Sequence, residues 1–137
     1  MIKKICKNIN ILRKPSVDLK ENELSVVTDL VDTLSYHLDK CVGMAANMIG
    51  INKNVIVIVL EDNSILPMIN PILMSKKGVY DTEEGCLSLE GVRPTKRYKV
   101  IEVKYFDTEF NETSRVFKGF EAEIVQHELD HLKGIII

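Results

Sequence analysis

The chain has 137 residues, of which 45% are apolar and 28% charged, and its formal net charge is −2. This length supports one hydrophobic core, so we expect a single domain over residues 1–137. The charge balance gives no support for specific nucleic-acid binding, and Lys96, Arg97 and Lys99 are interpreted as a solvated basic face. We expect no membrane association, because no signal peptide or membrane span is evident. Three widely spaced cysteines favour a reducing cytoplasm.

The first half of the chain predicts a long helix followed by strands. From Glu21 to Lys40, apolar residues recur at helical spacing and give one face for packing. Residues 54–60 are rich in β-branched side chains, which is typical of a buried strand. We expect the segment from Pro67 to Pro71 to interrupt the chain before another strand at residues 72–79.

The second half predicts a hairpin and a terminal helix. Residues 98–106 mostly alternate between apolar and polar, and we expect them to pair with residues 112–117 through a turn. After Gly119 the helical spacing returns, with Phe120, Ile124, His127 and His131 on one stripe. Gly134 is expected to end this helix, and the three final isoleucines to add a short edge strand.

The segment His127-Glu128-Leu129-Asp130-His131 carries the clearest chemical signal. Histidines four residues apart share one helical face, so both rings reach a common point where a metal ion binds. A divalent metal lowers the pKa of its bound water from 15.7 to roughly 7, and a neighbouring glutamate that is not a ligand accepts the proton. The alternative is an exposed helix on which these side chains merely face water.

A catalytic site of this kind needs a third protein ligand, which must lie upstream. Residues 132–137 contain no ligating side chain. The best donor is Cys86, within Glu83-Glu84-Gly85-Cys86-Leu87-Ser88, because a thiolate binds a borderline-soft metal well. Taken alone, Cys86 also fits a small buried hydrophobe, since free cysteines are among the most buried residues.

A third segment, Val42-Gly43-Met44-Ala45-Ala46-Asn47-Met48-Ile49-Gly50, contains small residues that permit close approach to its backbone. With the two motifs above it resembles, in order and spacing, the peptide deformylase family. That family carries a GxGxAAxQ loop, an EGCLS turn and a C-terminal HExxH helix. The resemblance spans roughly residues 10 to 137.

The resemblance implies an α+β fold, in which a mixed or antiparallel β-sheet surrounds the C-terminal HExxH metal-binding helix, with an N-terminal helix. It implies a metal-dependent hydrolase that removes the formyl group from N-formyl-methionine at the start of nascent polypeptides and releases formate. One divalent metal ion is implied, Fe²⁺ in the cell, with Zn²⁺, Ni²⁺ or Co²⁺ as substitutes. The ribosome near its exit tunnel is a further expected partner.

Individual residues receive roles from the same resemblance. The metal ligands are Cys86, His127 and His131. Glu128 corresponds to the general acid/base and Leu87 to the residue whose backbone N–H holds the oxyanion. Gly43 corresponds to a loop residue that binds the substrate backbone, and Glu84 and Arg93 to a supporting pair. The pocket for the substrate methionine is assigned to Val42, Met44, Ile124 and Val125.

Two positions in the first motif depart from the family. The glutamine that donates its amide to the formyl oxygen is Met48 here, and the motif's first glycine is Cys41. A thioether has no hydrogen to donate, and the loss of one oxyanion donor lowers kcat by roughly 100- to 1,000-fold. The adjacent Asn47 carries an amide and is an alternative donor.

Two other functional classes stay open at this level. A catalytically weak module would bind N-formyl peptides tightly and release negligible formate. A structural metal protein would close the site with a fourth ligand, for which Glu84 and Asp130 are the nearby candidates. The second class is disfavoured because Asp130 points about 100° around the helix from His131.

Overall fold

The computed structural model describes all residues, Met1 to Ile137, and its centre is a five-stranded antiparallel sheet in the order β1-β2-β3-β4-β5. The strands are β1 (Gly43–Ala45), β2 (Val55–Val59), β3 (Ile65–Cys86), β4 (Leu89–Phe106) and β5 (Glu112–Lys118). The α-helices are α1 (Ile9–Leu12), α2 (Ser25–Tyr36) and α3 (Gly119–Leu132), and the short 3-10 helices are η1 (Glu21–Glu23) and η2 (Ala46–Ile49). The expected α+β fold with helices near both ends is confirmed.

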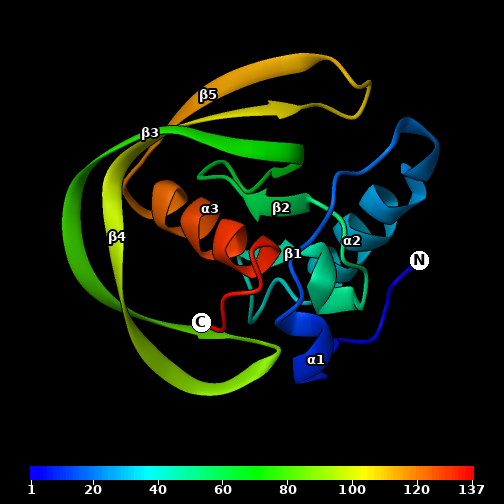
Figure 1. Cartoon of the computed structure of the whole chain (residues 1–137), viewed down its shortest axis with the longest axis horizontal. Helices are drawn as coiled ribbons and strands as arrows, with labels where there is room; N and C mark the ends of the chain where they lie inside the picture. Colours follow the sequence, from blue (N-terminus) through cyan, green and yellow to red (C-terminus); the bar gives the residue numbers. More distant parts are fainter.

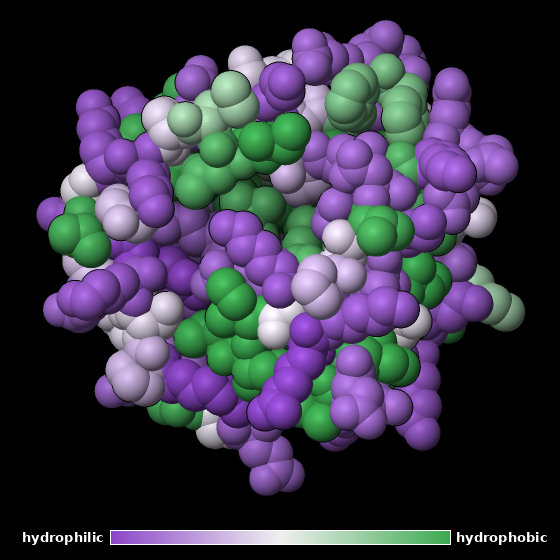
Figure 2. All heavy atoms as spheres, viewed as in Figure 1, coloured by the Kyte–Doolittle hydropathy of each residue, from purple (hydrophilic) through white to green (hydrophobic).

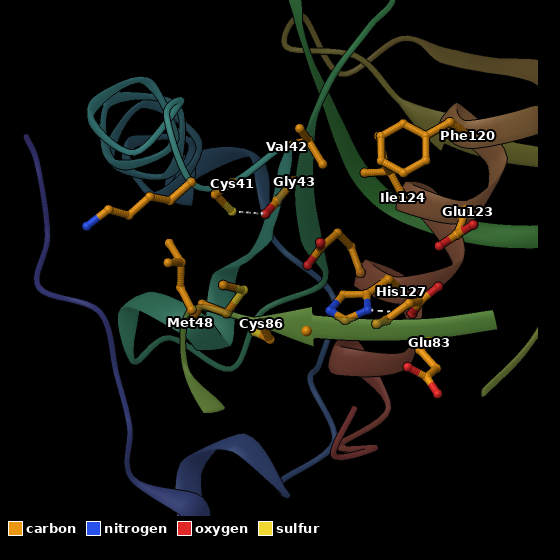
Figure 3. Close-up of a pocket in the computed structure, with 15 residues that line it drawn as sticks. Cys41, Val42, Gly43, Met48, Glu83, Cys86, Phe120, Glu123, Ile124 and His127 are labelled. Atoms are coloured by element: carbon orange, nitrogen blue, oxygen red, sulfur yellow. Dashed lines mark hydrogen bonds and ion pairs between the residues drawn. The ribbon is translucent and has the colours of Figure 1, made fainter. Parts of the chain in front are cut away.

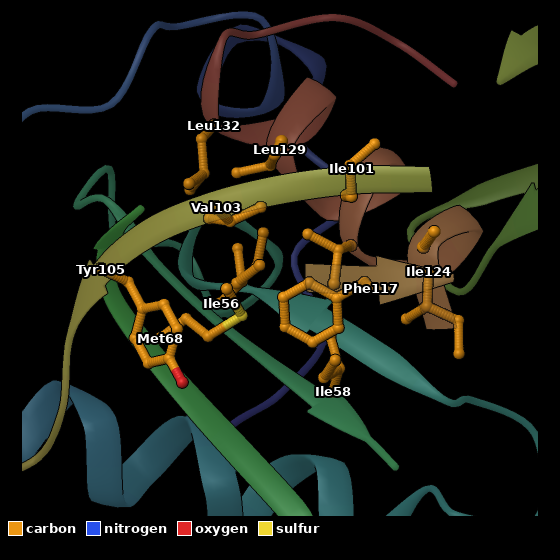
Figure 4. Close-up of a cluster of buried hydrophobic side chains, with 13 residues drawn as sticks. Ile56, Ile58, Met68, Ile101, Val103, Tyr105, Phe117, Ile124, Leu129 and Leu132 are labelled. Atoms are coloured by element: carbon orange, nitrogen blue, oxygen red, sulfur yellow. The ribbon is translucent and has the colours of Figure 1, made fainter. Parts of the chain in front are cut away.

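Strand β2 is buried on both faces because its β-branched residues alternate between two cores. Ile56 and Ile58 contribute to a cluster with side chains of α3 and β4. Val55 and Val57 point the other way, into a cluster with the apolar face of α2. Figure 4 shows Ile56 and Ile58 in the first cluster, where Phe117 and Met68 also pack. The sheet therefore separates two apolar layers, and α3 belongs to the first.

Strands β3 and β4 form a long curved ribbon that wraps around α3 (Figure 1). The prediction that residues 67–71 interrupt the chain is wrong, since β3 runs through both prolines. Pro67 pairs only with Val57 of β2, because β3 first pairs with β4 at Ile69. Pro71 falls in the register shift between Ile69 and Ile72. Both prolines thus occupy positions where no ladder N–H is needed.

Helix α3 is held inside the ribbon by apolar packing and by one polar anchor. The Gln126 amide donates to the Tyr98 carbonyl and accepts from the Tyr98 N–H, both at 2.8 Å. Tyr98 precedes the stretch of β4 that pairs with β5, which begins at Val100. Gln126 therefore takes the place of a missing neighbouring strand, as buried backbone groups require. This anchor fixes the rotation of α3 within the ribbon.

The C-terminal end of α3 passes close to the N-terminal segment. Gly134 has a φ of 79°, and a Cβ there would lie 2.2 Å from the Arg13 carbonyl oxygen, so a glycine is required. The prediction that Gly134 ends the helix is confirmed, but the final isoleucines form no strand, which corrects that expectation. Ile137 is instead 6% exposed and packs as a buried residue.

The remaining predicted elements agree with the structure in type. The helix expected from Glu21 to Lys40 is η1 followed by α2 and ends at Tyr36. The hairpin of β4 and β5 pairs Phe106 with Glu112, as predicted. Hydrophilic side chains dominate the face shown in Figure 2, with apolar groups in separate patches. No helix is long and apolar enough to cross a bilayer.

Candidate metal centre

Three possible metal ligands converge from two elements that are distant in sequence. Cys86 ends β3 at a tight hairpin, where it pairs with Leu89, and His127 and His131 lie one turn apart on α3. One donor atom from each lies within 4.8 Å of the others. The two Nε2 atoms face each other at 3.0 Å. Tetrahedral zinc with Zn–N bonds of about 2.0–2.1 Å separates its nitrogen ligands by roughly 3.3 Å, so the geometry fits one metal ion.

The charges around the donors also suit a cation. Burial disfavours a charged His127, but its contacts with Cys86 and Glu84 and the charge of Glu128 outweigh burial and raise its pKa to about 10. Burial and the charge of His127 lower the pKa of His131 to about 3, which keeps that ring neutral. The site therefore holds one positive charge between its donors when no metal is bound. A metal ion would take the place of the His127 proton, because histidine coordinates only when it is neutral.

Glu84 orients the first histidine ligand. Its Oε1 accepts a hydrogen bond from His127 Nδ1 at 2.7 Å, which leaves Nε2 free to face the other donors. Burial opposes ionisation of Glu84, but hydrogen bonds from His127 and Arg97 outweigh it and lower the pKa of Glu84 to about 2. Glu84 is thus a charged support for the ligand rather than a ligand itself.

The partner of Glu84 is Arg97, which corrects the expected Glu84–Arg93 pair. Arg97 donates to Glu84 at 2.6 Å and to Asp130 at 2.7 Å, and it is 4% exposed. Arg93 lies opposite Glu84 in the strand register but donates to the Glu90 carbonyl. Arg97 therefore does not belong to a solvated basic face. Because Glu84 and Asp130 are both engaged by Arg97, neither is available as a fourth ligand that would close the site.

Glu128 lies beside the ligands as a buried acid. It is 4% exposed, and its Oε1 has no hydrogen-bond partner. Burial raises its pKa to about 7, so its carboxyl group changes protonation near neutral pH. A Cβ added at Gly43 would lie 2.9 Å from Glu128 Oε2, so a glycine permits this close approach. The position and pKa of Glu128 suit a general acid and base.

Two of the three possible ligands and Glu128 border a cavity of about 410 Å³ between β1, η2, the β3–β4 hairpin and α3 (Figure 3). His127, Cys86 and Glu128 line it. Its lining also includes Val42, Gly43, Met48, Leu87 and Ile124, five positions assigned from the sequence. Leu87 lies between β3 and β4, and its N–H donates to no backbone carbonyl. This N–H is therefore free to bind a ligand.

Two expected pocket residues lie elsewhere. Met44 and Val125 are both 0% exposed and belong to the two apolar cores, Met44 beneath α2 and Val125 between α3 and the sheet. Phe120, which the sequence analysis did not assign to the pocket, lines the cavity instead. Its place on one helical stripe with Ile124 and His127 is the signal that could have identified it. Figure 3 shows Phe120, Ile124 and Val42 together on one side of the cavity.

The two departures in the first motif have distinct surroundings. Met48 lines the cavity, and its sulfur accepts the Ala45 N–H at 3.5 Å. Asn47 points away from the cavity and donates to the His131 carbonyl at 2.8 Å, so it does not replace the missing glutamine. Cys41 donates to the Gly43 carbonyl, and burial together with the charge of Glu128 raises its thiol pKa to about 12. Cys41 is therefore a neutral thiol, and it is not among the three donors that converge.

The fold, the three donors and the buried glutamate define a metal-dependent hydrolase. A family model described as "Polypeptide deformylase" matches residues 2–137. The chain belongs to this family. It is 52% identical over 137 residues to a peptide deformylase of Clostridium beijerinckii, covering 100% of both chains. It is 36% identical over 121 residues to peptide deformylase 1 of Clostridium perfringens, covering 87% of this chain and 81% of the relative.

Solved structures agree with this assignment. A peptide deformylase from Thermotoga maritima superposes with a TM-score of 0.88 at 29% identity, covering 99% of this chain and 95% of the other. A class I type b peptide deformylase from Acinetobacter baumannii, crystallised with Met-Ala-Ser bound, gives a TM-score of 0.88 at 29% identity. That match covers 99% of this chain and 97% of the other.

Proposed function

We propose that this protein removes the formyl group from N-formyl-methionine at the N-terminus of nascent polypeptides and releases formate. The observation that carries the proposal is the buried Glu128 beside Cys86, His127 and His131 at the edge of a cavity of about 410 Å³. The Acinetobacter baumannii protein with Met-Ala-Ser bound supports the substrate class. Met-Ala-Ser is the peptide that remains when formyl-Met-Ala-Ser loses formate.

The chain's own residues account for proton transfer and charge stabilisation. Cys86, His127 and His131 would hold a divalent metal, which would supply Lewis acidity and make water at the site more acidic. Glu128, whose pKa is about 7, accepts a proton from the attacking water and returns it to the departing amine. The free N–H of Leu87 donates a hydrogen bond to the developing oxyanion.

The cavity walls orient the peptide. Val42, Phe120 and Ile124 provide an apolar surface for the methionine side chain of the substrate. The Gly43 backbone faces the same cavity and is available to bind the substrate main chain. Met48 lies at the cavity wall near the ligands without offering a donor. Met44 and Val125 support these walls from the two cores.

The metal and the cellular setting extend this proposal. One thiolate and two imidazoles suit Fe²⁺, Zn²⁺, Ni²⁺ and Co²⁺, and we propose Fe²⁺ in the cell with zinc as a common substitute. We also propose a cytoplasmic location, contact with the ribosome near its exit tunnel, and neither specific nucleic-acid binding nor membrane attachment. The family to which the chain belongs supports the link to newly made polypeptides.

Formate release from formyl-Met-Ala-Ser by anaerobically prepared protein tests the function. Glu128→Ala should keep one metal ion per chain and lose formate release, whereas Cys86→Ala should lose the metal. Glu121→Ala is a matched control, since Glu121 lies on α3 and its side chain accepts from the Glu61 N–H. Full metal content in Cys86→Ala, or persistent activity in Glu128→Ala, would contradict the assigned roles.

A second candidate function is favoured by Met48. Without an amide donor at this position, the protein is a module that binds N-formyl peptides and turns them over slowly. Tight binding of formyl-Met-Ala-Ser with negligible formate release would support this candidate over an efficient enzyme.

A further inference from the structure

The two histidine ligands are supported in different ways. His127 Nδ1 donates to Glu84 at 2.7 Å, so its ring is oriented by a charged partner. His131 Nδ1 is buried and has no hydrogen-bond partner in the chain. A metal-binding histidine is ordinarily oriented through its second ring nitrogen. The orientation of His131 must therefore depend more strongly on the position of its main chain.

The main chain of His131 is held by the side chain of Asn47, which lies in η2 beside the cavity. The Asn47 amide donates to the His131 carbonyl at 2.8 Å and approaches the Leu12 carbonyl at 3.5 Å. The His131 carbonyl lies in the last turn of α3 and also accepts the Gly134 N–H at 3.0 Å. The Asn47 amide therefore adds a second donor, from outside the helix, to the final turn. Asn47 is 0% exposed, which shields these hydrogen bonds from water.

Asn47 is itself rigidly placed. It belongs to η2, whose Ala46 carbonyl accepts from the Ile51 N–H at 3.1 Å and whose Met48 carbonyl accepts from the Cys6 N–H at 2.7 Å. Strand β1 and the adjoining η2 contribute Gly43 and Met48, respectively, to the cavity wall. Asn47 thus joins the segment that lines the substrate cavity to the helix turn that carries a ligand.

We propose that Asn47 is a positioning residue that holds His131 in place for metal binding. This inference rests on the proposed metal centre and adds a determinant of its affinity and geometry. Loss of an outer partner of a metal ligand typically weakens metal binding ~10- to 100-fold. Loss of the Asn47 amide should therefore weaken metal binding more than it weakens peptide binding.

Co²⁺ binding to the Asn47→Ala protein tests the proposal, measured by competition with a chelator and by the visible absorption of bound Co²⁺. We expect ~10- to 100-fold weaker Co²⁺ binding and altered absorption bands, since these bands report ligand geometry. In formate release, kcat should fall while KM changes little. Asn47→Leu keeps the packed volume without the donor and should show the same losses, so it replaces Asn47→Ala if that variant does not fold.

Asn52→Ala is the matched control. The Asn52 amide donates to the Ile11 carbonyl at 3.0 Å and the Lys14 carbonyl at 3.3 Å, so it anchors the same N-terminal segment through bonds that do not involve α3. It should leave Co²⁺ affinity within about twofold of wild type, well below the effect of losing an outer partner. Thermal unfolding of the metal-free variants separates a general loss of stability from a loss specific to the site.

Wild-type affinity and absorption in both Asn47 variants would overturn the proposal, as would an equal loss in Asn52→Ala. A wild-type protein that binds Co²⁺ but releases no formate would remove the proposed function and leave the role of Asn47 to be decided by affinity. A wild-type protein that does not bind Co²⁺ would overturn both.

Discussion

Replacing Met48 with glutamine should increase turnover. Met48 is 1% exposed, lines the cavity and accepts the Ala45 N–H through its sulfur. Glutamine has a similar length, so its Oε1 can accept the same N–H while its Nε2 faces the cavity and donates to the oxyanion. That hydrogen bond acts mainly in the transition state, so kcat should rise with little change in KM.

The expected gain in kcat is roughly 10- to 1,000-fold, or about 1.4 to 4 kcal/mol of transition-state stabilisation. The folded protein should lose about 1–3 kcal/mol of stability, because one buried amide hydrogen lacks an acceptor when no substrate is bound. Formate release from formyl-Met-Ala-Ser gives kcat and KM, and both proteins must carry the same metal.

Met44→Gln is the control for this experiment. Met44 lies in the same segment but is 0% exposed within the core beneath α2. The added amide should lower stability without raising kcat. A fast wild-type enzyme whose kcat is unchanged in Met48→Gln would refute the reasoning, because another donor would then already stabilise the oxyanion.

Two further variants test the support of the site. Arg97→Met leaves the carboxylates of Glu84 and Asp130 without their cation and should lower the free energy of unfolding by about 3–5 kcal/mol in chemical denaturation. Lys96→Met removes only an exposed ion pair and should cost about 1 kcal/mol or less, so equal losses would contradict the distinction between these neighbours. Gly43→Ala places a Cβ 2.7 Å from Ile124 and 2.9 Å from Glu128, so kcat should fall by about tenfold or more through displacement of reacting groups. A wild-type kcat in Gly43→Ala would contradict this, because it would show that β1 moves to accept the methyl group without displacing the reacting groups.

The sequence predicted the elements wherever a local pattern has one structural solution. The β-branched run of β2, the alternation along β4 and the helical stripe of α3 each specify a period, and each element forms as expected. The prediction that Pro67 and Pro71 interrupt the chain was wrong. A strand tolerates proline where the edge that its N–H would face has no partner strand. That property belongs to the sheet and not to the segment.

In the candidate site, too, some features follow from the sequence and others only from the tertiary structure. The spacing of His127 and His131 on one helix follows from the sequence, as does the identity of Cys86 as the best upstream donor. Only the tertiary structure decides that Arg97 rather than Arg93 engages Glu84, because the curved ribbon of β3 and β4 brings Arg97 beside Asp130 of α3, which supplies a second carboxylate. The strand pairing places Arg93 directly opposite Glu84, yet the Arg93 side chain donates to the Glu90 carbonyl instead.

The tertiary structure also decided which apolar residues near the cavity are buried in the cores. Met44 and Val125 are apolar neighbours of cavity residues in sequence, yet a sheet with a core on each face draws them into those cores. Asn47 offers the same amide as glutamine, but its direction is set by the turn of η2 and the nearby end of α3. Sequence determines the chemical groups and their local period. Tertiary structure determines which of them meet, because strand register and helix rotation are fixed by contacts between segments far apart in the chain.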